Sequence, residues 1–168
     1  MKPADIIFSY NKFGKPYISD SGGNLQFNIS HCDNIIVFAF SSGNEIGVDV
    51  EKINMIEDMD GVADICFTQY EKDWLNRTES KTETFYKIWT IKEAFIKAIG
   101  RGFSFSPKDI ELTNESEDQI KIRNIYQKEF VKNYQTATIR ILADYFISLV
   151  YEGKKDVEIY NWNSDIYL

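Results

Sequence analysis

Hydrophobic and polar residues alternate near both ends of the chain, as they do in strands that bury one face. In the N-terminal part this pattern predicts strands at 5–10, 25–30, 34–41 and 46–53, with turns at 11–16 and 42–45. In the C-terminal part it predicts strands at 109–113, 119–125, 136–142 and 145–152. Between them, from roughly Ile56 to Ile99, apolar residues recur at helical spacing. This order of elements predicts an α+β fold, an antiparallel sheet packed by a long helix.

The longest predicted helix, FYKIWTIKEAFIKAIGRG from Phe85 to Gly102, carries a lysine in the middle of its apolar face. The segment 80–83 has the form of a capping box that would begin this helix, and Gly100 and Gly102 would end it. Lys92 projects from the apolar face. Because burial of an unpaired ammonium is costly, Lys92 should either extend its head to water or have an anionic neighbour. That neighbour is either a structural carboxylate or a ligand.

Composition narrows the class of protein. A length of 168 residues and a hydrophobic content of 43% predict one globular domain, 1–168. The net charge of −7 argues against general nucleic-acid binding, although the segment 85–108 is basic, with five Lys or Arg residues against one Glu. No segment has the pattern of a signal peptide or a membrane span, and Cys32 and Cys66 show neither a disulfide framework nor metal-ligand spacing. We expect a reduced, cytoplasmic protein that binds no nucleic acid and no membrane.

Candidate chemistry begins in IGVDVEKI, residues 46–53, where two carboxylates share one side of a predicted strand. Asp49 and Glu51 are two residues apart, so they point the same way while the valines beside Asp49 point into the core. Such oxygen ligands suit a hard cation such as Mg²⁺. The alternative is an exposed strand edge with two solvated acids, which is the commoner case for an isolated pair.

Glu93 and Lys97 lie one turn apart on the predicted long helix, at the margin of its apolar face. Such a pair is commonly a solvated ion pair. Together with Asp49, Glu51 and Lys92, however, it completes a set of three acids and two lysines. These residue types bind Mg²⁺ together with a phosphorylated ligand.

Two separated motifs carry a family resemblance. IGVDVE and WTIKEAFIKAIGRG resemble the paired signature of the 4′-phosphopantetheinyl transferases, a G-[IV]-D-[IV] strand and a [FW]-[STC]-x-K-E-[AS]-x-x-K helix. Every defined position is filled here: Gly47, Val48, Asp49, Val50, Trp89, Thr90, Lys92, Glu93, Ala94 and Lys97. The upstream stretches NKFGKPYI and FNISHC resemble the family's G-K-P turn and F-N-x-S-H segment. The likeness runs from about Phe8 to Glu152 and is closest to the larger, two-subdomain (Sfp-type) members.

The resemblance implies a 4′-phosphopantetheinyl transferase-like fold and a reaction. Such enzymes move phosphopantetheine from coenzyme A to a serine of an apo acyl or peptidyl carrier protein, with Mg²⁺ as cofactor, and release adenosine 3′,5′-bisphosphate. The basic segment 85–108 would then face the acidic carrier protein. The rival hypothesis is a protein that binds coenzyme A or docks a carrier protein without transfer. Retention of all three acids and both lysines favours the enzyme.

The resemblance also implies roles for individual residues. The implied metal ligands are Asp49, Glu51 and Glu93. The implied coenzyme A contacts are Gly14, Lys15, Pro16, Ser30, His31, Lys92 and Lys97. Glu93 and Lys97 would be catalytic, with Lys97 near the transferred phosphate. Glu93 is the favoured base for the carrier serine, and the alternative is a metal-bound hydroxide or a water relay.

One departure from the two-subdomain pattern is the short stretch of chain before the G-K-P turn at Gly14. We therefore expect a partial first subdomain at 1–45 and a second subdomain at 46–168. Either the stretch is naturally short, or it is truncated, or a second chain completes the first subdomain. A sheet left open by it would have an apolar face to cover, so we expect a possible homodimer with DIIFSY and NIIVFAF at the contact.

Overall fold

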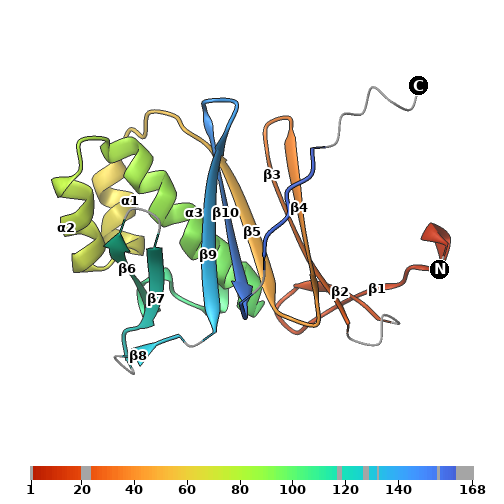
Figure 1. The fold of residues 1–168 in the computed structure, drawn as a ribbon. Coiled ribbons are helices and arrows are strands. Elements are labelled where there is room, and N and C mark those ends of the chain that lie inside the picture. The colour runs from red at the N-terminus through yellow and green to blue at the C-terminus, as the bar shows by residue number, and fades with distance from the viewer. Residues whose placement is uncertain are drawn as a thin grey trace.

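A three-stranded antiparallel sheet forms the centre of the molecule, with its strands in the order β5–β10–β9. These strands are β5 (Ile46–Lys52), β10 (Tyr145–Glu152) and β9 (Tyr134–Ile141). The computed structural model describes residues 2–19, 24–116, 119–126, 129–131, 133–154 and 156–161. The central sheet lies between a helical layer and a β-hairpin (Figure 1).

The long helix α3 (Lys81–Ile99) packs on one face of the central sheet, against β5 and β10. Two shorter helices, α1 (Met59–Cys66) and α2 (Gln69–Arg77), lie on the side of α3 that faces away from the central sheet, next to a second antiparallel sheet (Figure 1). That sheet has the order β6 (Ile110–Ser116), β7 (Gln119–Asn124) and β8 (Glu129–Phe130). The main hydrophobic core fills this layer and includes Phe67, Phe85, Ile88, Ile91 and Leu112.

The opposite face of the central sheet is covered by the hairpin β3 (Leu25–Cys32) and β4 (Ile35–Ser42). A second core lies between them and contains Ala39, Ile46, Val48, Val50, Tyr145 and Ile147. A smaller hairpin, β1 (Phe8–Tyr10) and β2 (Pro16–Ile18), lies next to β3. Short 3₁₀ turns occur at Pro3–Asp5, Gly102–Ser104 and Pro107–Asp109. Every strand pair of the described residues is antiparallel, which confirms the predicted α+β class.

Gly47 allows α3 to approach β5 closely. A Cβ atom on Gly47 would lie 2.0 Å from the carbonyl oxygen of Ala94 and 2.4 Å from the backbone nitrogen of Ala98. Both are backbone atoms of α3, so no side chain could move to make room. The small residues Gly47, Ala94 and Ala98 therefore set the distance between the helix and the strand that carries Asp49.

The two ends of α3 differ from the prediction in one respect. Gly100 ends the helix in the left-handed conformation, with φ of 62°, as predicted. Ser80 is the first residue before the helix, but its side chain makes no capping hydrogen bond, so the predicted capping box at 80–83 is wrong. A capping box occurs instead at the start of α2, between Thr68 and Glu71.

In the described part of the chain, no helix combines the length and the apolar composition that crossing a membrane requires.

Candidate active site

Asp49 and Lys97 meet where α3 crosses β5. Asp49 is only 4% exposed. Its Oδ1 atom lies 2.6 Å from the Nζ atom of Lys97. Ser30, on β3, joins this pair: its hydroxyl donates to Asp49 Oδ1 at 3.1 Å and accepts from Lys97 Nζ at 3.0 Å. Burial raises the pKa of Asp49, and the ammonium of Lys97 opposes that rise. The solvated strand edge considered as an alternative is therefore wrong for Asp49.

Glu51 and Glu93 flank this pair from the strand and from the helix. Burial is the main cause that raises the pKa of both carboxyls, and the charge of Asp49 raises both further. Glu51 also accepts a hydrogen bond from Trp89 of α3, which opposes the rise. Trp89 fills a position of the family motif, but nothing in the sequence indicated that its indole would orient a carboxylate.

The three acids offer the oxygen ligands that a hard divalent cation prefers. The Oδ2 atom of Asp49 is buried and finds no hydrogen-bond partner among the described residues. A buried carboxylate oxygen normally has a partner, so this atom is suited to a ligand from outside the chain. In the described part of the chain no three acidic, His or Cys side chains stand close enough together to enclose an ion. The charge of Asp49 raises the pKa of both glutamates, and a cation between the three carboxylates would oppose that effect.

Lys92 has the anionic neighbour that the sequence analysis expected, but that neighbour is a carboxylate of the chain and not coenzyme A. Its ammonium was expected to contact coenzyme A, but the side chain is 1% exposed and forms an ion pair with Glu71, with Nζ and Oε2 2.7 Å apart. The ammonium also lies within hydrogen-bond distance of the carbonyl oxygens of Cys66, Pro107 and Ile110. The structural carboxylate, which was the alternative, is therefore the observed partner, and the assignment of Lys92 as a coenzyme A contact is corrected.

The turn that contains Gly14, Lys15 and Pro16 lies at the C-terminal end of α3. The Nζ atom of Lys15 donates to the carbonyl oxygens of Ala98 at 2.6 Å and Ile46 at 3.2 Å. An ammonium in this position stabilises the free carbonyls of a helix end. Gly14 has a φ of 90°, which allows the tight turn that directs Lys15 to the helix. The expected contact of this turn with the nucleotide stays a prediction.

Ser30 and His31 occupy opposite faces of β3. Ser30 is buried against Asp49, whereas His31, the next residue, is exposed and pairs across the hairpin with the exposed Ile36. The structure therefore brings Ser30 to the carboxylates and does not bring His31 to them. The predicted contact of His31 with a phosphate is untested.

The basic segment 85–108 does not form one positive patch. Lys92 is buried with Glu71, and Lys97 is paired with Asp49. Lys108 is exposed in the turn after α3. Of the five cations that suggested a surface for an acidic carrier protein, Lys92 is thus committed inside the molecule and Lys97 is committed to a partly exposed ion pair.

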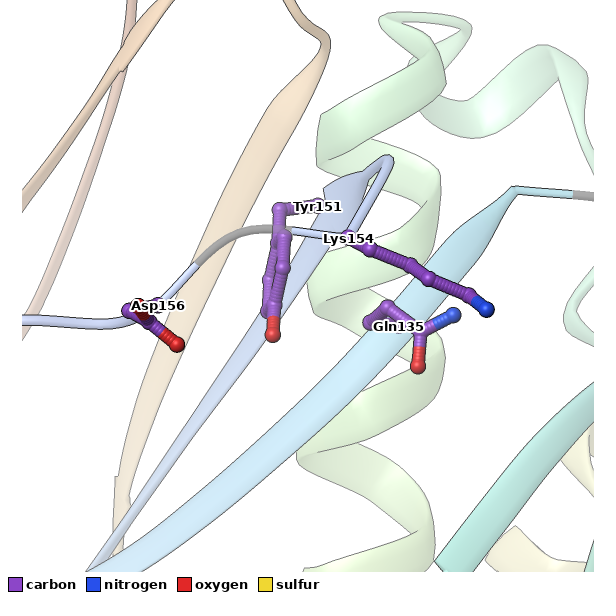
Figure 2. Close-up of a pocket in the computed structure, with 4 residues that line it drawn as sticks. All are labelled: Gln135, Tyr151, Lys154 and Asp156. Atoms are coloured by element: carbon purple, nitrogen blue, oxygen red, sulfur yellow. The ribbon is translucent and has the colours of Figure 1, made fainter.

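A pocket of about 330 Å³ lies at the end of the central sheet and is lined by Gln135, Tyr151, Lys154 and Asp156 (Figure 2). Ser148, three residues before Tyr151 on β10, faces α3 and hydrogen-bonds to Thr90. Because side chains alternate along a strand, Tyr151 points to the other face of the sheet. This pocket is therefore separate from the group around Asp49.

Known proteins share both the sequence motifs and the fold. Residues 45–150 match the model of the 4′-phosphopantetheinyl transferase superfamily. The chain is 34% identical over 133 residues to 4′-phosphopantetheinyl transferase gsp of Aneurinibacillus migulanus, covering 78% of this chain and 53% of that protein. It is 35% identical over 140 residues to 4′-phosphopantetheinyl transferase ffp of Bacillus subtilis, covering 80% of this chain and 60% of that protein. The chain thus spans little more than half the length of these relatives.

Solved structures show the same fold. A holo-(acyl-carrier-protein) synthase from Bacillus anthracis, in complex with CoA (3′,5′-ADP), superposes with a TM-score of 0.54 at 22% identity, covering 66% of this chain and 96% of that one. The holo-[acyl-carrier-protein] synthase of Thermotoga maritima gives a TM-score of 0.52 at 20% identity, covering 66% and 64%. With the family model matching more than half of its length, the chain belongs to the 4′-phosphopantetheinyl transferase superfamily.

Proposed function

We propose that this protein transfers the 4′-phosphopantetheine group of coenzyme A to a serine of an apo acyl or peptidyl carrier protein. The serine oxygen attacks the phosphorus that bears pantetheine, and the bond from that phosphorus to adenosine 3′,5′-bisphosphate breaks. Curated relatives named 4′-phosphopantetheinyl transferases support the proposal, as does the Bacillus anthracis synthase, whose structure is a complex with CoA. The observation on which it rests most is the unpaired, buried Oδ2 atom of Asp49 beside Lys97.

Asp49, Glu51 and Glu93 are proposed to hold Mg²⁺. Bound there, the ion would neutralise the pyrophosphate of coenzyme A and the charge that develops on the leaving phosphate. Two of the acids come from β5 and the third from α3, so the contact between strand and helix determines how they converge. Ser30 keeps Oδ1 of Asp49 in a hydrogen bond and leaves Oδ2 free for the ion.

Lys97 is proposed to bind the transferred phosphate, and Glu93 to accept the proton of the carrier serine. The side chain of Lys97 is 30% exposed, so it can reach a ligand that arrives from solvent. Glu93 is half-buried and lies one helical turn before Lys97 on α3, so it stands next to the proposed phosphate site. Gly14, Lys15, Pro16 and His31 remain proposed contacts of coenzyme A.

The test is mass spectrometry of an apo carrier protein after incubation with this protein, coenzyme A and Mg²⁺. The carrier gains one phosphopantetheine mass if the proposal holds. An unchanged carrier, together with coenzyme A binding measured by calorimetry, would favour a coenzyme A-binding protein without transfer. A Glu93→Gln variant is the matched control, because it preserves the shape of the side chain and removes the proposed base and ligand.

We also propose the division of the chain into a partial first subdomain at 1–45 and a second subdomain at 46–168, and a homodimer in solution. The hairpins β1–β2 and β3–β4 fall in the first part, and all three helices fall in the second. The exposed apolar residues of the hairpins support the dimer.

A further inference from the structure

The ion pair between Glu71 and Lys92 is more deeply buried than any part of the proposed active site. Glu71 is 0% exposed and Lys92 1% exposed. Burial raises the pKa of Glu71 and lowers that of Lys92, and the charge of each residue opposes the shift of the other. A buried ion pair is commonly no more stabilising than a well-packed apolar pair, because removing two charges from water is costly. Stability alone therefore does not explain this pair.

Every polar atom of the pair is used. Glu71 Oε2 accepts from the backbone nitrogen of Thr68 at 2.8 Å, and Oε1 accepts from that of Leu112 at 2.7 Å. Lys92 Nζ lies 3.2 Å, 2.8 Å and 2.9 Å from three carbonyl oxygens, those of Cys66, Pro107 and Ile110. These partners belong to the end of α1, to the turn after α3, to the start of α2 and to β6. The pair therefore fixes α3 to four neighbouring segments at once.

A second polar contact holds α3 from the side of the central sheet. The hydroxyl groups of Thr90 and Ser148 lie 2.7 Å apart, and both residues are 0% exposed. Ser148 is the direct neighbour of Asp49 in the sheet. Thr90 and Lys92 are about 200° apart around the helix, at about 100° per residue. The helix is thus held by polar groups on two nearly opposite sides, and Glu93 is the residue that follows Lys92.

We propose that Glu71 and Lys92 are a positioning pair, which fixes the rotation of α3 about its axis and thereby aims Glu93 and Lys97 at Asp49. This inference rests on the proposed function, because it takes those residues as the metal and phosphate site. Apolar packing alone permits small rotations of a helix, whereas a fully hydrogen-bonded buried pair permits one arrangement. The pair touches neither the proposed metal nor the phosphate and acts through the helix.

The test is the double variant Glu71→Gln/Lys92→Met, with Mn²⁺ alone as the probe. The double variant removes both charges and keeps the volume, but it leaves one backbone N–H group and three carbonyl oxygens without their partners, so its urea midpoint should be lower than that of the wild type. Metal binding is therefore measured under conditions in which the variant is folded. Its affinity for Mn²⁺, measured by electron paramagnetic resonance, should fall roughly tenfold or more, in the range found when residues that orient metal ligands are changed. The kcat for transfer should fall similarly with KM for coenzyme A nearly unchanged.

The matched control is Asp64→Asn/Lys72→Met, which removes an ion pair of the same net charge from α1 and α2 at more exposed positions. It should leave Mn²⁺ affinity and kcat unchanged.

A folded Glu71→Gln/Lys92→Met protein with wild-type Mn²⁺ affinity and kcat would overturn the proposal. If that variant does not fold, Glu71→Asp replaces it, because a carboxylate shorter by one methylene group can keep Lys92 only by moving α3. A folded Glu71→Asp protein with unchanged Mn²⁺ affinity would equally overturn the proposal, and weakened affinity would support it.

The two readouts separate this inference from the proposed function. If the wild type binds Mn²⁺ but transfers nothing, the proposed reaction fails, and Mn²⁺ affinity still decides the role of the pair. If the wild type neither binds Mn²⁺ nor transfers, the positioning role falls with the site.

Discussion

At the scale of single residues, Lys97 and a bound cation would compete for Asp49. Lys97 Nζ lies 2.6 Å from Oδ1 of Asp49. Replacing Lys97 with Met removes a positive charge next to the proposed metal site, which is worth about 1 kcal/mol at this degree of exposure. We predict that Lys97→Met binds Mn²⁺ about fivefold more tightly, as measured by electron paramagnetic resonance, while transfer is largely lost.

The control for this prediction is Lys72→Met, which removes the same charge from α2, where it pairs with Asp64. Its Mn²⁺ affinity should equal that of the wild type. Weaker Mn²⁺ binding by Lys97→Met would contradict the competition and would mean that Lys97 supports the metal site.

Asp49 should make the stability of the protein depend on Mg²⁺. A ligand that binds only the folded state at a concentration a hundredfold above its Kd adds about 2.7 kcal/mol to the free energy of unfolding. We predict that Mg²⁺ raises the Tm of the wild type and does not raise that of Asp49→Asn, measured by differential scanning fluorimetry. Without metal, Asp49→Asn should have an equal or slightly higher Tm, because it removes a carboxylate that burial disfavours. The control Asp64→Asn, which changes an exposed carboxylate, should show the same rise of Tm with Mg²⁺ as the wild type. If Asp49→Asn also shows that rise in full, Asp49 is excluded as a ligand.

The residues near Asp49 illustrate what the sequence can and cannot predict. The spacing of Asp49 and Glu51 predicted a shared side of a strand, and the spacing of Glu93 and Lys97 predicted neighbouring turns of one helix. The sequence also indicated that Lys92 needs an anionic partner. It could not identify Glu71 as that partner, because the contact joins residues far apart in the chain. The form T-x-x-E at 68–71 was a signal for a capping box, but that form says nothing of a second partner for the glutamate.

At the scale of elements, the approach of α3 to β5 should depend on Gly47. A Cβ atom there would meet two backbone atoms of α3 within 2.4 Å, so the helix must move away from the strand. We predict that Gly47→Ala lowers the free energy of unfolding by about 3 kcal/mol, measured by urea denaturation, as expected for overpacking against rigid backbone.

Gly61 of α1 provides the matched control. A Cβ atom on Gly61 would meet the side chain of Asp58, which would have to give up its capping hydrogen bond to the Gly61 nitrogen. That loss is worth about 1 kcal/mol, and the higher helix propensity of Ala offsets it. Gly61→Ala should therefore change stability by less than about 1 kcal/mol. Equal losses of unfolding free energy in the two variants would show that Gly47 is not required for the close contact between α3 and β5.

The strands and the long helix were predictable because each has a clear period. Strand β5 was predicted at 46–53 and is observed at Ile46–Lys52, and β10 was predicted at 145–152 and is observed there. The short strands Pro16–Ile18 and Glu129–Phe130 were not predicted, because so few residues show no period. The capping box was predicted at the wrong helix because the pattern S/T-x-x-E occurs at both 80–83 and 68–71. Only the second forms the capping hydrogen bonds, and its Glu71 also has tertiary partners.

At the scale of the whole molecule, the outer face of the β3–β4 hairpin is apolar and exposed. Ile36, Phe38 and Phe40 of β4 are 62%, 56% and 61% exposed, and the rings of Phe38 and Phe40 are stacked. The inner face of the same hairpin is held to β5 by side chains, since Asn28 and Ser30 accept hydrogen bonds from the backbone nitrogens of Val48 and Val50. The hairpin is thus firmly attached on one side and presents unburied aromatic surface on the other, as interaction surfaces do.

We predict that this surface holds the proposed homodimer together. Multi-angle light scattering at micromolar concentration should give about twice the mass of the chain, because a two-fold dimer is the commonest way for a chain to bury such a face. Phe38→Thr/Phe40→Thr keeps the strand preference of both positions and should shift the mass to that of a monomer without loss of the fold. Ile65→Thr, on α1 and 73% exposed, removes exposed apolar surface elsewhere and should stay dimeric. A wild-type protein that remains monomeric up to the highest concentration measured would refute the dimer, and a dimer unaffected by the double variant would place its contact away from β4.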